Sequence, residues 1–225
     1  MSVYRFSIKG EMPLHGETYV SGGKNTSLAV LPAIILCDEP CVIENLPDID
    51  DINVLYDILC HLGAKVDYQR DKKRMTIDPT SVNCTTVPYR FTQQMRASYY
   101  LMGALFGRYG EASVGYPGGC AIGSRPIDQH IKGFCLLGAE FLEEGGMLHL
   151  KGERRGSIIN FDMATVGGTI NVMLAACKAK GNTVLTNAAR EPHVVDLANF
   201  LNSMGARIRG AGTSTIRIRG VQKLT

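Results

Sequence analysis

The chain has 225 residues, of which 45% are hydrophobic and 20% are charged, and its formal net charge is +3. This length allows one large or two small domains with a real core, and the weak, scattered positive charge does not favour a nucleic-acid-binding protein. The longest apolar run, residues 28–37, contains Pro32 and is too short to span a bilayer, so we expect no membrane association.

The seven cysteines form no CxxC pair and show no zinc-like spacing. His61 and His193 lack partners at ligand spacing, so we assign no metal, and we expect no cofactor. Because the start of the chain carries no apolar signal segment, we expect a reduced, cytoplasmic protein with free thiols.

The same order of predicted elements occurs three times along the chain. An apolar helix comes first, at residues 26–36, 97–106 and 169–178. A short strand follows, at 42–45, 112–114 and 183–187, and then an amphipathic helix at 52–61, 127–136 and 194–203. A hairpin-like return, such as residues 74–77 or 216–218, completes each unit.

A repeated tripeptide marks the end of each amphipathic helix. It reads Leu62-Gly63-Ala64, then Leu137-Gly138-Ala139, then Met204-Gly205-Ala206. The glycine is predicted to stop the helix at its C′ position before a strand begins. Three such units can bury their apolar helices together and leave their sheets outside, which predicts one pseudo-threefold domain.

We therefore divide the chain into a short segment and one domain. Residues 1–21 are expected to form a separate hairpin, with arms at 6–9 and 17–20. Residues 22–225 form the domain, with repeats at roughly 22–90, 91–156 and 157–220.

The turns before the apolar helices carry the chemically distinctive residues. Gly22-Gly23-Lys24 runs directly into the first helix, and this pattern indicates an anion site of backbone N–H groups and one cation. It is equally typical of a capped helix with a solvated lysine. Arg96 takes the same place in the second unit, and residues 164–168 do so in the third. If these turns converge on one rim, they suit a phosphorylated ligand.

Cys120 lies on a glycine-rich loop, with Arg125 and a helix start at Pro126 close behind it. A guanidinium and a helix N-terminus lower a thiol pKa, so this pattern indicates a reactive cysteine, although a packed cysteine in a loop is the simpler alternative.

Two other patterns are interpreted as structural. Four arginines alternate with isoleucine near the C-terminus and predict an exposed sheet face, namely Arg207, Arg209, Arg217 and Arg219. Asp128 and His130 are two residues apart, which is the wrong spacing for an acid–base pair on one helix face.

These motifs together resemble the enolpyruvyl transferase family along nearly the whole chain. The matching segments are Gly23-Lys24-Asn25, Met95-Arg96-Ala97-Ser98, Pro117-Gly118-Gly119-Cys120, Ile122-Gly123-Ser124-Arg125-Pro126-Ile127-Asp128, Val166-Gly167 and Asn187-Ala188-Ala189-Arg190-Glu191-Pro192. The resemblance implies an α/β fold, an inside-out α/β barrel domain built from three repeated helix-strand units.

The resemblance also implies a reaction. The enolpyruvyl group of phosphoenolpyruvate is transferred to the 3′-hydroxyl of UDP-N-acetylglucosamine with release of phosphate, the first committed step of peptidoglycan synthesis. The Cys120 thiol is implied to donate the proton, and Lys24 with Asn25 to handle phosphoenolpyruvate. Fosfomycin, an epoxide that targets this family's thiol, is implied to alkylate Cys120.

Further residues are implied to bind the substrates. Arg96 and Arg125 would surround the phosphates, and the UDP-sugar would contact Arg125, Pro126, Ile127, Asp128 and Gln129. The nucleotide-binding turn would comprise Met163, Ala164, Thr165, Val166 and Gly167. Met163 departs from the family pattern, where a lysine is expected.

The family has two such domains with the active site between them, so we expect this chain to be one of the two and poorly active alone. Residues 1–21 would pack on the second domain, which also carries the general base. The alternatives are a non-catalytic module that binds UDP-sugar or phosphoenolpyruvate, and a transferase of the shikimate type.

Overall fold

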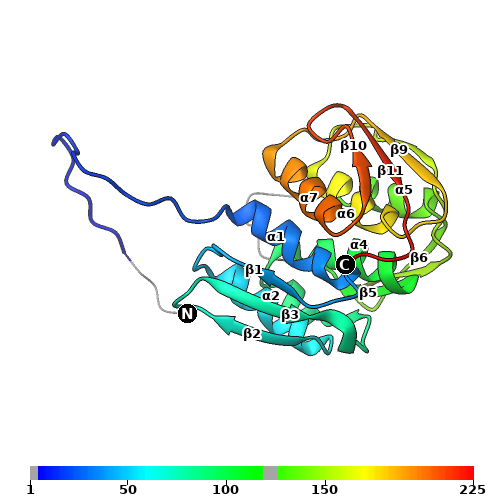
Figure 1. Ribbon diagram of the computed structural model, residues 1–225, viewed down its shortest axis with the longest axis horizontal. Helices are drawn as coiled ribbons and strands as arrows, with labels where there is room; N and C mark the ends of the chain where they lie inside the picture. Colours follow the sequence, from blue (N-terminus) through cyan, green and yellow to red (C-terminus); the bar gives the residue numbers. More distant parts are fainter. Residues whose placement is uncertain (1–4, 119–125) are drawn as a thin grey trace.

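The computed structural model describes residues 5–118 and 126–225. Residues 5–23 contain neither helix nor strand and lead away from the body of the molecule (Figure 1). Phe6, Ile8 and Leu14 are each at least 88% exposed. The hairpin predicted for residues 1–21 is therefore not formed in its described part, because no apolar surface covers either arm.

The first unit begins with an apolar helix and ends in a hairpin. Its elements are α1 (Lys24–Ala33), η1 (Ile34–Leu36), β1 (Cys41–Ile43), α2 (Asp50–His61), β2 (Lys65–Gln69), β3 (Arg74–Asp78) and η2 (Pro79–Ser81). The strands form an antiparallel sheet in the order β1-β3-β2. The amphipathic helix α2 buries its apolar face, which includes Leu55 and Ile58, and carries Asp50 and Asp51 in its first turn.

The second unit contains a four-stranded sheet. Its elements are β4 (Thr86–Val87), α3 (Tyr89–Thr92), η3 (Arg96–Tyr99), α4 (Tyr100–Tyr109), β5 (Glu111–Gly115), α5 (Asp128–Leu136), β6 (Ala139–Glu144) and β7 (Met147–Gly152). The strand order is β4-β5-β7-β6, and only β4 and β5 are parallel. The second repeat was predicted to begin at about residue 91. Because β4 pairs with β5, its sheet begins earlier, at Thr86.

The third unit repeats the arrangement of the second. Its elements are β8 (Ile158–Asn160), α6 (Val166–Ala176), β9 (Asn182–Thr186), α7 (Pro192–Ser203), β10 (Arg207–Arg209) and β11 (Thr215–Arg219). The strand order is β10-β11-β9-β8, and β8 runs parallel to β9. The second and third units therefore share one topology.

The hydrophobic core is built around α1, α4 and α6. Each of these helices buries an unbroken run of residues, at 27–33 in α1, 101–107 in α4 and 168–176 in α6. Helix α4 lies against both α1 and α6. Helices that are apolar on all sides belong in the middle of a protein, which agrees with the predicted common burial of the three apolar helices.

The glycines of the repeated tripeptide adopt one conformation. Gly63, Gly138 and Gly205 have φ angles of +96°, +97° and +98°. Each follows the last turn of an amphipathic helix, and the N–H of the next residue bonds five residues back in the first and third units. The predicted helix stops are confirmed, because only glycine adopts this left-handed conformation without steric cost.

Candidate functional site

One cavity of about 670 Å³ opens where α1, η3, α5 and α6 begin. Its walls consist of Lys24, Asn25, Leu28, Asp51, Arg96, Ala97, Tyr99, Tyr100, Pro126, Asp128, Gln129, His130, Met163, Ala164, Thr165, Val166, Gly167 and His193. The three turns that the sequence analysis singled out therefore meet at one place. Cys120 and Arg125 lie outside the described residues.

The first wall is the turn that leads into α1. An added Cβ at Gly22 would lie 1.9 Å from the carbonyl oxygen of Asn45, so only glycine allows this close passage of the chain. Lys24 Nζ lies 2.5 Å from Asp51 Oδ2, in the first turn of α2. The ammonium group is 27 residues from its carboxylate partner in sequence, and this ion pair holds it at the cavity.

Arg96 and two tyrosines form the second wall. The guanidinium carbon of Arg96 lies 5.3 Å from the centre of the Tyr99 ring, which is a cation–π distance. Burial raises the pKa of Tyr99 to about 12, and the nearby Arg96 only partly offsets this effect. The Tyr99 hydroxyl therefore stays protonated at neutral pH.

Helix α5 and the loop after β8 are joined by a side-chain network. Gln129 donates through Nε2 to Asp162 Oδ2 at 3.0 Å, and its Oε1 accepts from the Asp162 backbone N–H at 3.0 Å. Lys132 Nζ contacts Asp162 Oδ1 at 2.6 Å. Gln129 thus serves the fold by fixing the loop that leads to residues 163–167. Ile127 is 6% exposed in the core and does not line the cavity.

The third wall is the start of α6. The Thr165 side chain accepts from the Gly168 N–H at 3.2 Å and caps the helix. Helix geometry leaves the N–H groups of Val166 and Gly167 without intrahelical partners, so this end favours an acceptor or an anion. Met163 is 60% exposed at the same rim.

The cavity also contains residues that sequence reasoning did not select. Those with a polar or ionisable group are Asp51, Tyr99, Tyr100, His130 and His193. The Asp50-Asp51 pair at a helix start and Lys24 were both visible in the sequence, but the ion pair between Asp51 and Lys24 was not. His130 was set aside because of its spacing from Asp128, whereas its partner in the structure is Asn171.

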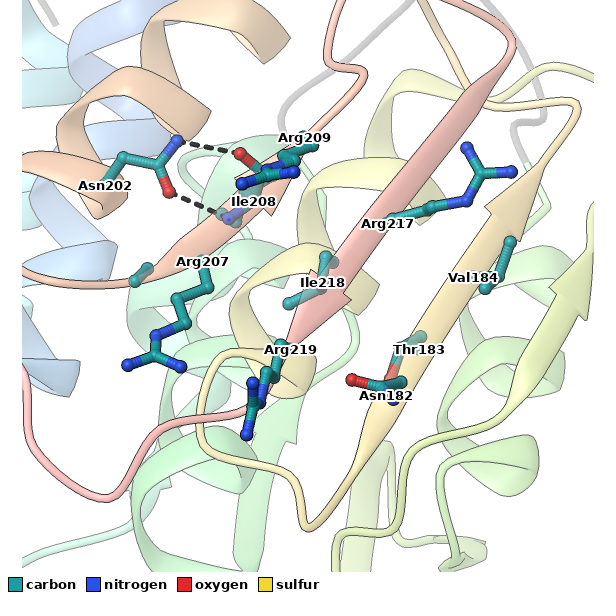
Figure 2. A pocket seen from close by; sticks show the side chains of 11 residues that line it. Asn182, Thr183, Val184, Asn202, Arg207, Ile208, Arg209, Arg217, Ile218 and Arg219 are labelled. Atoms are coloured by element: carbon teal, nitrogen blue, oxygen red, sulfur yellow. Dashed lines mark hydrogen bonds between the residues drawn. The ribbon is translucent and has the colours of Figure 1, made fainter.

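A larger groove, of about 800 Å³, lies over the third sheet and includes none of the predicted site residues. Figure 2 shows its four arginines on the neighbouring strands β10 and β11. All four are exposed, as predicted for a sheet face. At the sheet edge, Asn202 bonds both the N–H and the C=O of Ile208 at 2.9 and 3.0 Å, which closes that edge to a further strand.

Within residues 5–118 and 126–225, no three His, Cys, Asp or Glu side chains are grouped so that they could hold a metal ion. No helix in the same ranges is long and apolar enough to cross a membrane. The chemical character of the cavity is instead set by Lys24, Arg96 and the α6 N-terminus, which suit a ligand rich in phosphoryl or carboxylate oxygens.

Curated relatives match almost the whole chain. It is 56% identical over 221 residues to UDP-N-acetylglucosamine 1-carboxyvinyltransferase 3 of Caldanaerobacter subterraneus subsp. tengcongensis, covering 98% of this chain and 52% of that protein. It is 48% identical over 221 residues to UDP-N-acetylglucosamine 1-carboxyvinyltransferase 2 of Bacillus subtilis, covering 98% and 51%. The chain thus spans about half the length of the relatives it matches.

Solved structures share the fold at lower identity. The enolpyruvyl transferase NikO from Streptomyces tendae aligns with a TM-score of 0.77 and 24% identity, over 89% of this chain and 47% of that one. EPSP synthase from Acinetobacter baumannii aligns with a TM-score of 0.73 and 18% identity, over 93% and 48%. The predicted α/β fold agrees with these neighbours.

The family model of EPSP synthase (3-phosphoshikimate 1-carboxyvinyltransferase) matches residues 8–225. The chain belongs to this enolpyruvyl transferase family.

Proposed function

We propose that this chain forms one half of an enolpyruvyl transferase that acts on phosphoenolpyruvate and UDP-N-acetylglucosamine. The observation that carries the proposal is the cavity in which Lys24, Asn25, Arg96 and the 163–167 turn meet. Relatives with 48–56% identity bear the name of this activity, whereas the aligned EPSP synthase shares only 18%. That difference favours the UDP-sugar over a shikimate-type substrate.

In the proposed reaction, C3 of phosphoenolpyruvate gains a proton while the sugar 3′-hydroxyl oxygen bonds to C2. The hydroxyl proton goes to a base, which we assign to the second half of the enzyme. The C2–O bond to phosphate then breaks, C3 loses a proton, and the alkene forms again. Phosphate is the leaving group, and no oxidation or reduction occurs.

The described residues would supply charge and orientation. We assign Lys24 and Asn25 to phosphoenolpyruvate, since they begin α1 at the cavity. Arg96 would face the phosphates, and Pro126, Asp128 and Gln129 would meet the UDP-sugar. Ile127 is buried, so it would support these residues from the core rather than contact the UDP-sugar. The turn from Met163 to Gly167 would hold the nucleotide phosphates through backbone N–H groups rather than a lysine.

Two assignments rest on sequence alone, because their residues lie outside the described ranges. We propose Cys120 as the proton donor and the target of fosfomycin, and Arg125 as a phosphate contact. Burial raises the pKa of Cys41 to about 12, with neighbouring Cys37 adding to the effect, and burial also raises that of Cys135. A thiol probe should therefore label Cys120 before these two.

We also propose the finer architecture and setting. The three units would form an inside-out α/β barrel with pseudo-threefold symmetry, since the second and third sheets share one strand order. Residues 1–21 would pack on the second domain. The six cysteines of the described ranges are all free, which supports a reducing, cytoplasmic location. The names of the relatives support a role in peptidoglycan precursor synthesis.

Calorimetric titration of this chain tests the proposal. We expect saturable binding of UDP-N-acetylglucosamine and much weaker binding of shikimate 3-phosphate, and Lys24→Ala should weaken phosphoenolpyruvate binding about tenfold through loss of one charged contact. Preference for shikimate 3-phosphate would support the shikimate-type alternative. Failure to bind any of these compounds would contradict both proposals.

A further inference from the structure

Four arginines on the outer face of the third sheet take no part in the proposed reaction. They line the groove of about 800 Å³, which shares no residue with the cavity described above. Arg207 of β10 lies opposite Arg219 of β11, and Arg209 lies opposite Arg217 (Figure 2). All four side chains are exposed. The face therefore presents two cross-strand pairs of like charge.

The chain does not neutralise these charges. Like charges that lie directly opposite each other on a sheet repel and lower stability. No ion pair within residues 5–118 and 126–225 involves any of the four arginines. On the other side of β11, Asn182 of β9 lies opposite Arg219, and Val184 lies opposite Arg217. Neither of these two neighbours carries a charge.

The second sheet shows the same place with its charge balanced. Glu140 in β6 and Arg207 in β10 both come directly after the repeated tripeptide, and the two sheets share one strand order. Glu140 lies opposite Lys151 of β7, just as Arg207 lies opposite Arg219. On its other side Lys151 lies opposite Glu111. The third unit thus keeps the backbone arrangement of the second but replaces a balanced set of charges with an unbalanced one.

The spacing of the arginine pairs matches an extended peptide. The two pairs lie two residues apart along the strands, which is about 6.8 Å at the usual rise of a strand. An extended peptide presents every second side chain on one face at the same spacing. Carboxylates at alternate positions can therefore each meet one arginine pair, and a guanidinium binds a carboxylate through two N–H groups.

The groove suits a peptide better than a nucleic acid. No aromatic side chain is among the described residues that line it, so the bases of a single strand have no platform for stacking. Val184 is half-buried beside Arg217, and Ile158 of β8 lies opposite Val184 and is 74% exposed. These two side chains offer apolar contact to residues that flank the carboxylates.

We propose that the outer face of the third sheet is a docking surface for an acidic segment of a partner protein. The segment is extended and carries a carboxylate at every second residue, and each carboxylate lies between the two arginines of one cross-strand pair. Because the groove and the cavity share no residue, this site is separate from the one assigned to the substrates.

Fluorescence anisotropy with short labelled peptides tests the spacing and the charge. We expect a peptide of alternating glutamate and threonine to bind about threefold more tightly than one of the same composition with its glutamates in a single block. The peptide with glutamine in place of glutamate should not bind. Equal binding of the alternating and block peptides, or tighter binding of a thymidine oligonucleotide, would overturn the proposal.

Substitutions in the two pairs test the site. Arg217→Gln and Arg219→Gln should each weaken binding of the alternating peptide about threefold, and about tenfold together. Lys151→Gln, at the equivalent place in the second sheet, is the matched control and should leave peptide binding unchanged. Urea unfolding should show that the arginine variants are no less stable than the unaltered chain, because repulsion is relieved.

Two further outcomes would contradict the proposal. One is peptide binding that the arginine variants and Lys151→Gln change equally, since the charge of the whole chain would then be responsible. The other is displacement of the peptide by the C-terminal half of the Caldanaerobacter relative, since the second half of the enzyme would then cover this face. Neither outcome bears on the proposed function, which concerns the cavity.

Discussion

His130 links the cavity to the acid stability of the chain. The ring is enclosed by Tyr99 and Asn171, and the charged groups that act on it are Arg96 and Asp128. Its pKa is about 4 in the folded chain and about 6.5 when unfolded. Because the unfolded chain binds the proton first, this group lowers stability as the pH falls below 6.5 and has no effect above it.

We therefore predict that His130→Gln removes part of the acid sensitivity. Between pH 7 and pH 5 the unaltered chain should lose about 2 kcal/mol more unfolding free energy than the variant. Urea unfolding at both pH values measures this difference. Equal losses would show that the ring of His130 is not buried in its neutral form.

At the scale of elements, the contact between α4 and α6 depends on glycine. An added Cβ at Gly103 would lie 2.4 Å from the backbone oxygen of Asn171 and 2.7 Å from its Oδ1. Gly107, one turn later, faces the backbone of Leu174 at 2.9 Å. Backbone atoms cannot turn aside as a flexible side chain does, so the two helices would have to separate.

Gly103→Ala should lower the unfolding free energy by about 3 kcal/mol. The helix shift should also weaken UDP-N-acetylglucosamine binding, since Gly103 holds Asn171 and Asn171 holds His130. Gly10→Ala is the control, because nothing lies within 4 Å of the added atom. If both variants unfold at the same urea concentration, the close helix contact is not what stabilises this core.

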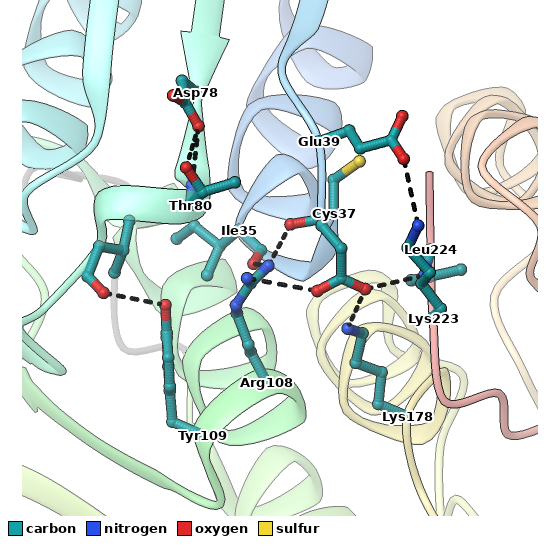
Figure 3. Close-up of polar contacts among 12 residues, drawn as sticks. Ile35, Cys37, Glu39, Asp78, Thr80, Arg108, Tyr109, Lys178, Lys223 and Leu224 are labelled. Carbon is teal, nitrogen blue, oxygen red and sulfur yellow. Dashed lines mark hydrogen bonds and ion pairs between the residues drawn. The ribbon is translucent and has the colours of Figure 1, made fainter.

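At the scale of the whole molecule, Asp38 joins the three units, and Figure 3 labels three of its partners, namely Arg108, Lys178 and Leu224. It follows η1 of the first unit and contacts Arg108 of the second unit at 3.3 Å and Lys178 of the third at 2.9 Å. The same carboxylate accepts the Leu224 N–H at 3.1 Å. Burial alone would raise the pKa of Asp38, but Lys178, Leu224 and Arg108 together hold it below its usual value.

Asp38→Asn should therefore cost about 3 kcal/mol of stability, because two half-buried cations lose their counter-charge. The neighbouring substitution Glu39→Gln is the matched control, since the Glu39–Lys223 pair is exposed and should contribute under about 1 kcal/mol. Because the pKa of Asp38 is lowered, its contribution is present above pH 4 and is lost in stronger acid. Chemical unfolding at pH 7 measures both losses of unfolding free energy. Equal losses in the two variants would contradict a stabilising role for the Asp38 carboxylate.

The periodicity of the sequence was sufficient to predict the repeated helices and the glycines that end them. The three apolar helices, the three amphipathic helices and their glycine stops follow from local patterns of burial and backbone conformation. The short strands β4 and β8 were missed, because two or three residues carry no periodicity and depend on pairing with β5 and β9. The hairpin over residues 1–21 was wrong in its described part, since alternation alone does not supply a surface to pack against.

The candidate site was predictable where its residues stand beside a turn, as Lys24, Arg96 and Thr165 do. It was not predictable where a contact joins distant segments. Lys24 and Asp51 are 27 residues apart, and His130 and Asn171 are 41 apart. Such pairs are set by the packing of helices, which spacing within one element does not reveal. The proposed roles of Cys120 and Arg125 remain predictions from the sequence.

We propose that this cavity performs enolpyruvyl transfer when a second half completes it. The direct measurement is phosphate release from phosphoenolpyruvate and UDP-N-acetylglucosamine by this chain, alone and mixed with the C-terminal half of the Caldanaerobacter relative. We predict release only from the mixture, dependent on the UDP-sugar and lost with Lys24→Ala. Phosphate release by the chain alone would contradict the assignment of the base to the second half. A mixture that binds the UDP-sugar but releases no phosphate would identify a binding module instead.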